Sequence, residues 1–288
     1  MDIVLALVSA LAFGLSVVLI RKRLDESNPF SVTLVVAVTG NVIFWPLALL
    51  FTNLATISLK GILFFAIAGM LAPGITMLLY FKGMESVGVS VSASIFATYP
   101  VYSSIFAVLF LGEVLAPENW IGLMCIVVGV VTIEKSLGKA GSEPRPASRK
   151  GLVLPLLASL TNASSFIVRK HGLTIYNEPL IGVAIGCSSS FILCLPLSIS
   201  YAEPGSTFSG KDFRLFWKAG VCMSVGWVST YYALCHGNVS IITSLIQTQP
   251  LFVLLFAYLH VKELEHLSFK LVMNALLIVI GVMLLHIN

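Results

Sequence analysis

The chain has 288 residues, of which 58% are hydrophobic and only 10% are charged. A soluble domain carries roughly 25% charged residues to cover its surface, so this composition excludes a water-soluble globular protein. The net charge of +4 does not indicate nucleic-acid binding, because the lysines and arginines lie in short segments between long apolar runs. In such places they act as signals of membrane topology.

Long apolar runs follow one another along the whole chain. A spanning helix needs about 20 apolar residues, and the runs are continuous rather than alternating, which excludes a membrane barrel. We therefore predict an all-α integral membrane protein with ten transmembrane helices. The predicted spans are 2–20, 30–51, 60–81, 87–111, 117–134, 151–169, 179–200, 213–235, 239–260 and 267–286. We expect Pro73-Gly74 to interrupt the third run and Gly226 to interrupt the eighth.

An internal repeat relates the two halves of the chain at an offset of 150 residues. The predicted domains are a five-helix repeat at 1–135, a polar linker at 136–149 and a second five-helix repeat at 150–288. Because five is odd, the second repeat must enter the membrane upside down. Inverted repeats place a substrate site near the membrane midplane and work by alternating access. The pairs in register are Pro29 with Pro179, Pro46 with Pro196, Ser90 with Ser240, Pro100 with Pro250 and Glu113 with Glu263.

The basic residues are distributed unequally between the two sides of the predicted membrane. Only Lys60, Arg169 and Lys170 lie on the side that follows the even-numbered spans. The positive-inside rule therefore places both termini outside and the central linker in the cytoplasm. The opposite side carries fourteen basic residues, Arg21, Lys22, Arg23, Lys82, Lys135, Lys139, Arg145, Arg149, Lys150, Lys211, Arg214, Lys218, Lys262 and Lys270.

We expect no charged side chain near the centre of any span. Intramembrane charges normally mark ion or proton pathways, so their absence argues against antiport through a central carboxylate. It also argues against phosphate-bearing substrates, which need Arg or Lys in the site. The remaining polar groups suit a neutral or zwitterionic metabolite. The predicted substrate-binding residues are Ser94, Thr98, Asn162, Trp227, Tyr231, Ser244, Gln247 and Thr248.

Each of these groups also has a structural interpretation. Serine and threonine near a proline often bond to carbonyls of their own helix, and small residues let membrane helices approach closely. Pro100 and Pro250 are expected to kink their spans, either to shape the central cavity or for packing alone. Glu113 and Glu263 are expected at helix ends, where they pair with a base, cap a neighbouring helix or remain solvated charges.

One motif is present in both halves of the chain. Tyr99-Pro100 through Leu111-Gly112-Glu113 is mirrored by Gln249-Pro250 through Val261-Lys262-Glu263. This pattern resembles the EamA family of the drug/metabolite transporter superfamily, although Lys262 replaces the more usual glycine. The resemblance implies a ten-helix exporter or carrier of small organic metabolites, often amino acids. It also implies that both termini lie in the cytoplasm. This orientation is the reverse of the one that the distribution of basic residues predicts.

Two other functions remain alternatives. A lipid-intermediate flippase of the same superfamily would need a groove open to lipid. A membrane enzyme is disfavoured because no HExxH, GxSxG, acidic-cluster or P-loop motif occurs. The five cysteines form no CxxC pair, so we expect neither a metal site nor a cofactor. The expected partners are a small-molecule substrate and the lipid bilayer of the cytoplasmic membrane, and we expect no nucleic acid. For the oligomeric state, a monomer and a homodimer both remain alternatives.

Overall fold

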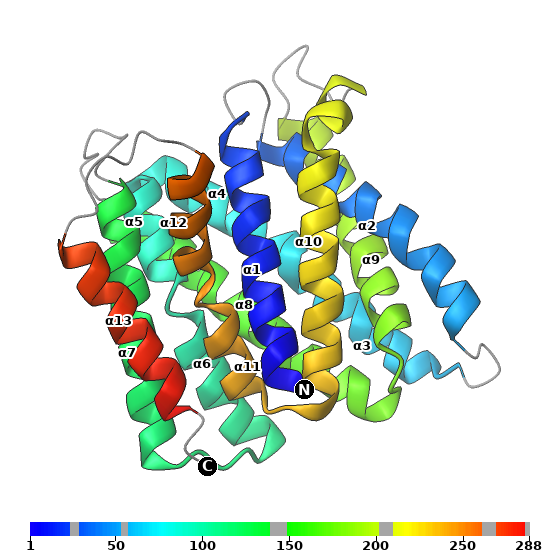
Figure 1. The fold of residues 1–288 in the computed structure, drawn as a ribbon. Helices are drawn as coiled ribbons and strands as arrows, with labels where there is room; N and C mark the ends of the chain where they lie inside the picture. Colours follow the sequence, from blue (N-terminus) through cyan, green and yellow to red (C-terminus); the bar gives the residue numbers. More distant parts are fainter. Residues whose placement is uncertain (24–28, 53–56, 139–148, 202–209, 261–268, 286–288) are drawn as a thin grey trace.

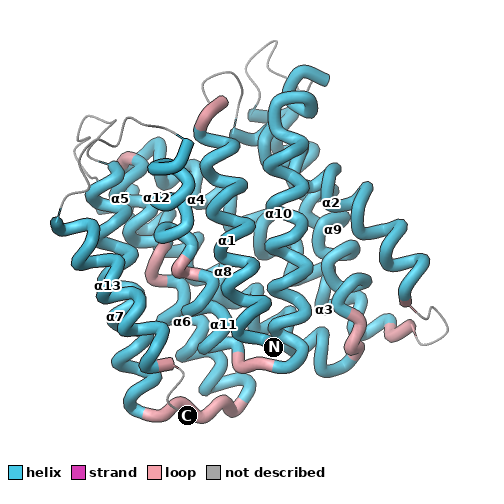
Figure 2. The backbone as a smooth tube through the Cα atoms, in the orientation of Figure 1, coloured by secondary structure: helices cyan, strands magenta, loops and turns pink. Residues whose placement is uncertain are grey.

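The computed structural model describes residues 1–23, 29–52, 57–138, 149–201, 210–260 and 269–285. Every regular element within these ranges is helical (Figure 2). Seven of the helical segments are long and apolar enough to cross a membrane, and two shorter apolar helices, Pro117–Ile133 and Met273–Leu284, accompany them. The protein is therefore a multi-pass membrane protein.

The elements follow the predicted runs with small shifts at their ends (Figure 1). In the third and fourth runs the helix is divided into shorter pieces, two of them π-helical turns labelled η. The first half contains α1 Asp2–Arg21, α2 Pro29–Phe51, α3 Leu59–Gly69, η3 Met70–Ile75, α4 Thr76–Val87, α5 Val89–Phe96, α6 Tyr99–Phe106, η4 Ala107–Leu111 and α7 Pro117–Gly138. The second half contains α8 Arg149–Ile175, α9 Pro179–Tyr201, α10 Gly210–His236, α11 Val239–Ile246, α12 Gln249–His260 and α13 Phe269–Leu284.

The two interruptions expected within spans have different outcomes. In η3, Ala72 has an extended backbone (φ −142°, ψ 128°) directly before Pro73, so the third run is broken there. The expectation for Gly226 is wrong, because α10 is continuous through it. The absence of a side chain at Gly226 instead lets α1 approach, and the ring of Phe13 lies where a Cβ atom would be. Ser9 Oγ donates to the Gly226 carbonyl at 2.9 Å.

Two helix breaks occur at corresponding positions of the two halves. One lies between α5 and α6 before Pro100, and the other lies between α11 and α12 before Pro250. The threonine of each break donates to the carbonyl three residues earlier, Thr98 to Ile95 at 2.6 Å and Thr248 to Leu245 at 2.7 Å. In Figure 1 the α5–α6 pair runs from the upper to the lower edge, whereas α11–α12 runs from the lower to the upper edge.

Glycines allow the closest helix contacts in the bundle. Gly69 of α3 faces Gly186 of α9, and Ser190 Oγ donates to the Gly69 carbonyl at 2.7 Å. Gly122 of α7 and Gly281 of α13 face each other so closely that a Cβ at Gly281 would lie 2.6 Å from the Gly122 carbonyl oxygen. Small residues at membrane-helix interfaces let backbones pack in this way.

Polar and apolar side chains are distributed as in a protein surrounded by lipid. Large apolar residues such as Phe110 and Ile192 are about two-thirds exposed on the outside, at 70% and 67%. Hydroxyl groups lie inside, where Ser9 and Thr230 are fully buried and bonded to each other at 2.7 Å between their side-chain oxygens. The interior of the bundle is therefore the place to look for a polar site.

Candidate functional site

A charged residue lies inside the bundle, where the sequence predicted none. Arg169 is only 1% exposed, because α8 continues to Ile175 and carries it among the neighbouring helices. The predicted sixth span ends at this residue and leaves it at the membrane surface, and that prediction is wrong. The expectation of an interior without charge is wrong for the same reason: the spanning helix continues past Arg169 and Lys170.

The guanidinium group has one backbone acceptor in the described structure, and the Tyr231 side chain is a further polar partner. Arg169 Nη2 donates to the carbonyl oxygen of Ala72 at 2.7 Å. In a regular helix this carbonyl would accept from the residue four positions later. Here the backbone of Ala72 is extended, and the Thr76 N–H donates to the carbonyls of Leu71 and Pro73 instead. The break in the third span therefore supplies an acceptor to α8.

Three aromatic rings surround the same guanidinium group. Its Cζ atom lies 4.6 Å from the ring centroid of Trp227, 5.1 Å from that of Phe166 and 5.4 Å from that of Tyr231. Trp227 and Tyr231 are four residues apart and so share one face of α10. We call Arg169, these three rings and the Ala72 carbonyl the arginine cage. Cation–π contacts of this kind contribute ~0.5–2 kcal/mol each.

These contacts leave the positive charge incompletely compensated. The Nε and Nη1 atoms of Arg169 are buried without a hydrogen-bond partner. Within the part of the chain that the structure describes, no carboxylate forms an ion pair with Arg169. Removing an ion from water costs several kcal/mol even after relaxation of the protein. The arginine cage thus holds a cation that lacks a full negative charge.

The structure places the predicted binding residues in two groups. Trp227 and Tyr231 belong to the arginine cage, and Asn162 lies on the same face of α8 because it precedes Arg169 by seven residues. The mirrored hydroxyl groups lie near the two helix breaks. Ser244 Oγ donates to the Ser240 carbonyl at 2.7 Å. Thr98 and Thr248 likewise donate to carbonyls of their own helices. Ser94 is buried, and Gln247 is partly buried at the second break.

Arg169, Phe166 and Tyr99 are site residues that the sequence prediction missed. Tyr99 stacks on Phe166 with ring centroids 5.8 Å apart and planes 3° apart, which extends the aromatic wall to α6. The sequence contained one signal for the longer helix. No proline follows Arg169 until Pro179, so nothing required the helix to end at the charge.

Glu113 lies between η4 and α7 of the first half and contacts a helix of the second half. Gly112 adopts a left-handed conformation (φ 68°) that ends η4, and the Glu113 carboxylate then accepts from the N–H groups of Val239 and Ser240 at 2.5 and 3.1 Å. It also accepts from Ser240 Oγ at 2.6 Å. A carboxylate at a helix N-terminus satisfies free donors and complements the helix dipole. Its predicted mirror, Glu263, lies outside the described residues.

Lys170 contacts the turn between α10 and α11 from the α10 end. Its Nζ atom donates to the Leu234 carbonyl at 2.6 Å and to the Gly237 carbonyl at 3.1 Å. A cation there complements the negative end of the α10 dipole. Glu113 and Lys170 therefore clamp the turn between α10 and α11, which lies at the lower edge of Figure 1 near the N-terminus.

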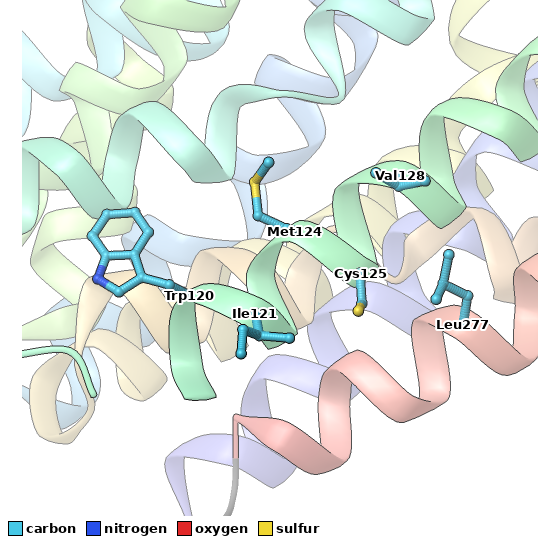
Figure 3. Close-up of a pocket in the computed structure, with 6 residues that line it drawn as sticks. All are labelled: Trp120, Ile121, Met124, Cys125, Val128 and Leu277. Atoms are coloured by element: carbon cyan, nitrogen blue, oxygen red, sulfur yellow. The ribbon is translucent and has the colours of Figure 1, made fainter. Parts of the chain in front are cut away.

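A groove lies on the outside of the bundle. Its volume is about 390 Å³, and Figure 3 shows the side chains of α7 and α13 that line it. It is lined by Trp120, Ile121, Met124, Cys125, Val128 and Leu277. These side chains carry no charge, so the groove offers apolar surface to an acyl chain but no group to bind a phosphate headgroup.

Comparisons with known proteins agree with this arrangement. The EamA-like transporter family matches residues 1–134 and again residues 149–287. The uncharacterized transporter YwfM of Bacillus subtilis (strain 168) is 29% identical over 65 residues, which are 23% of this chain and 22% of that relative. The match thus spans about a fifth of that relative's length. One protein crystal structure has the same fold, with a TM-score of 0.82, 15% identity, and coverage of 98% of this chain and 95% of that one.

Proposed function

The chain belongs to the EamA-like transporter family, and from this premise we propose that it carries a small organic metabolite, such as an amino acid, by alternating access. The spanning segments number ten, because α10 adds a further crossing to the apolar helices. They form two inverted five-helix repeats at 1–135 and 150–288, with 136–149 as the linker. The opposite directions of α5–α6 and α11–α12 support this inversion (Figure 1). In inverted repeats, one half rocks against the other around a central site.

The buried arginine carries the proposal. Charged residues inside membrane proteins are costly and are normally found at substrate or ion pathways. Arg169 is almost fully buried and faces rings from α8 and α10, which suits a substrate with both a polar and an apolar part. The proposed binding residues are Arg169, Phe166 and Tyr99 together with the predicted Ser94, Thr98, Asn162, Trp227, Tyr231, Ser244, Gln247 and Thr248.

The clamped turn between α10 and α11 supplies the gate. Glu113 and Lys170 hold this turn from two sides, so releasing both would let the end of the bundle near the termini open. Pro100 and Pro250 begin the helices that follow the mirrored breaks, and the breaks provide points at which α5 and α11 can tilt. Glu263, which matches Glu113 in the sequence repeat, is the gating residue that we propose for the second half.

The buried position of Arg169 also strengthens the charge argument for orientation. An arginine inside the bundle is no longer an interfacial charge, so the side opposite the linker keeps only Lys60 and Lys170 of the original three. The fourteen basic residues on the linker side support a linker in the cytoplasm and both termini outside the cytoplasmic membrane.

A ligand screen followed by transport tests this function. The purified full chain is heated with single members of a library of amino acids, oxo acids, dicarboxylates, polyamines and nucleosides. A ligand that binds the folded state raises the melting temperature. Each stabilising compound is then offered, radiolabelled, to proteoliposomes that contain the protein. We expect uptake above that of protein-free liposomes; a library that yields no transported compound contradicts the proposal.

A further inference from the structure

We propose that the carried substrate bears a carboxylate and that Arg169 binds this group within the arginine cage. This inference rests on the proposed transport function and specifies the chemical class of its substrate. It replaces the expectation of a substrate site without charge.

The hydrogen-bond donors of Arg169 give the first argument. A guanidinium group has five N–H donors. Nη2 uses one of them on the Ala72 carbonyl, whereas Nε, with one donor, and Nη1, with two, have no partner. A carboxylate offers two acceptor oxygens, and hydrogen bonds between a guanidinium and a carboxylate are among the stronger ones in proteins. Such a group would satisfy donors that are otherwise buried and unused.

The charge balance gives the second argument. Arg169 is 1% exposed, and its described neighbours are a carbonyl oxygen, three aromatic rings and the neutral hydroxyl group of Tyr231. These are dipoles and quadrupoles rather than ions, so none cancels the full charge. A buried cation needs a paired anion with satisfied hydrogen bonds to offset its desolvation. A bound carboxylate provides both the charge and the acceptors.

The surroundings favour one carboxylate over a phosphate or an organic cation. The neighbouring Lys170 directs its Nζ atom to the α10 carbonyls of Leu234 and Gly237, so it does not add a second charge to the arginine cage. A doubly charged phosphate would be matched by only one cation. An organic cation would be attracted by the rings but repelled by the guanidinium. The rings of Trp227, Phe166 and Tyr231 suit the apolar remainder of a carboxylic acid.

A purely structural role is the rival explanation for Arg169. In that case the guanidinium would only brace α8 against the broken third span through the Ala72 carbonyl. A brace predicts a change in stability upon substitution but no preference for acids over neutral compounds. The test therefore compares ligands that differ only in the carboxylate.

The probes are acetate with acetamide, L-alanine with L-alaninamide, and benzoate with benzamide, and inorganic phosphate serves as a separate arm. Thermal unfolding of the purified full chain gives the concentration that produces half of the stabilisation. We expect at least one acid to act at a concentration about tenfold or more below that of its amide. Arg169→Gln should abolish this difference, and Arg169→Lys should retain part of it because the charge remains. The exposed Arg214→Gln is the matched control and should behave as wild type.

Any of the following results would overturn the inference. One is an equal effect of acids and amides on the wild-type protein, which needs no variant to interpret. Another is a preference for acids that survives in Arg169→Gln, or an Arg169-dependent effect of phosphate alone. Transport separates this inference from the proposed function. If a neutral or cationic compound is transported equally by wild type and Arg169→Gln, the function stands and the carboxylate inference fails. If acids bind through Arg169 but none crosses the membrane, the site stands and the function fails.

Discussion

Arg169 Nη2 donates to the Ala72 carbonyl oxygen at 2.7 Å, so the buried cation of α8 binds the backbone at the point where the third span leaves helical geometry. The two residues are 97 positions apart and lie in different halves of the chain. Their contact joins the two repeats at the arginine cage. A movement of one repeat against the other would therefore alter the surroundings of the charge.

Replacing the buried cation with an apolar residue should not destabilise the protein. Arg169→Met leaves the Ala72 carbonyl without its donor, which costs about 1–3 kcal/mol. It also removes an ion whose burial costs several kcal/mol, so the melting temperature is expected at or above the wild-type value. Thermal unfolding of the ligand-free protein checks this. A fall of more than about 4 °C would mean that Arg169 is mainly a structural brace.

Gln247 tests the contribution of the second helix break. It has no polar counterpart in the first half, since Ala97 occupies the corresponding position. Gln247→Ala should weaken binding of a transported compound about tenfold or more through loss of one hydrogen-bond partner. Folding should be unaffected, because alanine is well tolerated in a helix. Binding is measured by ligand-dependent thermal shift.

Gln249→Ala is the matched control, because Gln249 lies beside the same break and is also partly buried. Its affinity should remain at the wild-type level. If Gln247→Ala binds normally but melts at a lower temperature, then Gln247 is a packing residue rather than a binding residue.

Glu113 should control the opening of the turn between α10 and α11. In Glu113→Gln the neutral amide loses the charge-assisted bonds to Val239 and Ser240, a loss of roughly 1–2 kcal/mol for a helix cap. Hydrogen exchange of the first α11 amides, followed by mass spectrometry, should become faster. The exposed Glu85→Gln serves as the control and should leave this exchange unchanged. Unaltered exchange in Glu113→Gln would show that the cap does not hold the turn.

The orientation can be tested by cysteine labelling in a variant without the five native cysteines. Val114 follows the Glu113 cap and is 89% exposed, on the side assigned to the exterior. A cysteine at Val114 should react with an impermeant thiol reagent in intact cells. A cysteine at Ser142, in the linker, should react only after the cells are opened. The reverse pattern would place both termini in the cytoplasm, as the family resemblance implies.

The sequence indicates the membrane-spanning segments well because their length and continuous apolar character are local properties. The break before Gly74 was also predictable, since a proline ends the ladder of backbone hydrogen bonds wherever it occurs. The continuity at Gly226 was not, because its cause is the ring of Phe13 from another helix. A glycine that breaks a helix and one that admits a neighbour look alike in sequence.

The site was less predictable than the spans. Trp227 and Tyr231 were identified from their apolar surroundings, but Arg169 was assigned to the membrane surface because a charge usually ends a hydrophobic run. Its burial depends on rings from α10 and on a carbonyl 97 residues away. The contact between Glu113 and the start of α11 spans 126 residues. Such long-range contacts leave no local pattern in the sequence.

Counterflow in proteoliposomes tests the central claim most directly. Vesicles containing the protein are loaded with an unlabelled compound from the ligand screen and then given the same compound, radiolabelled, outside. A carrier that alternates between two sides exchanges the two pools, so the label should accumulate transiently inside. Trp227→Ala should reduce this exchange, because the compound loses apolar contact in the arginine cage, while Arg214→Gln should not. Label that enters no faster than into protein-free vesicles, for every compound that binds, would contradict the account.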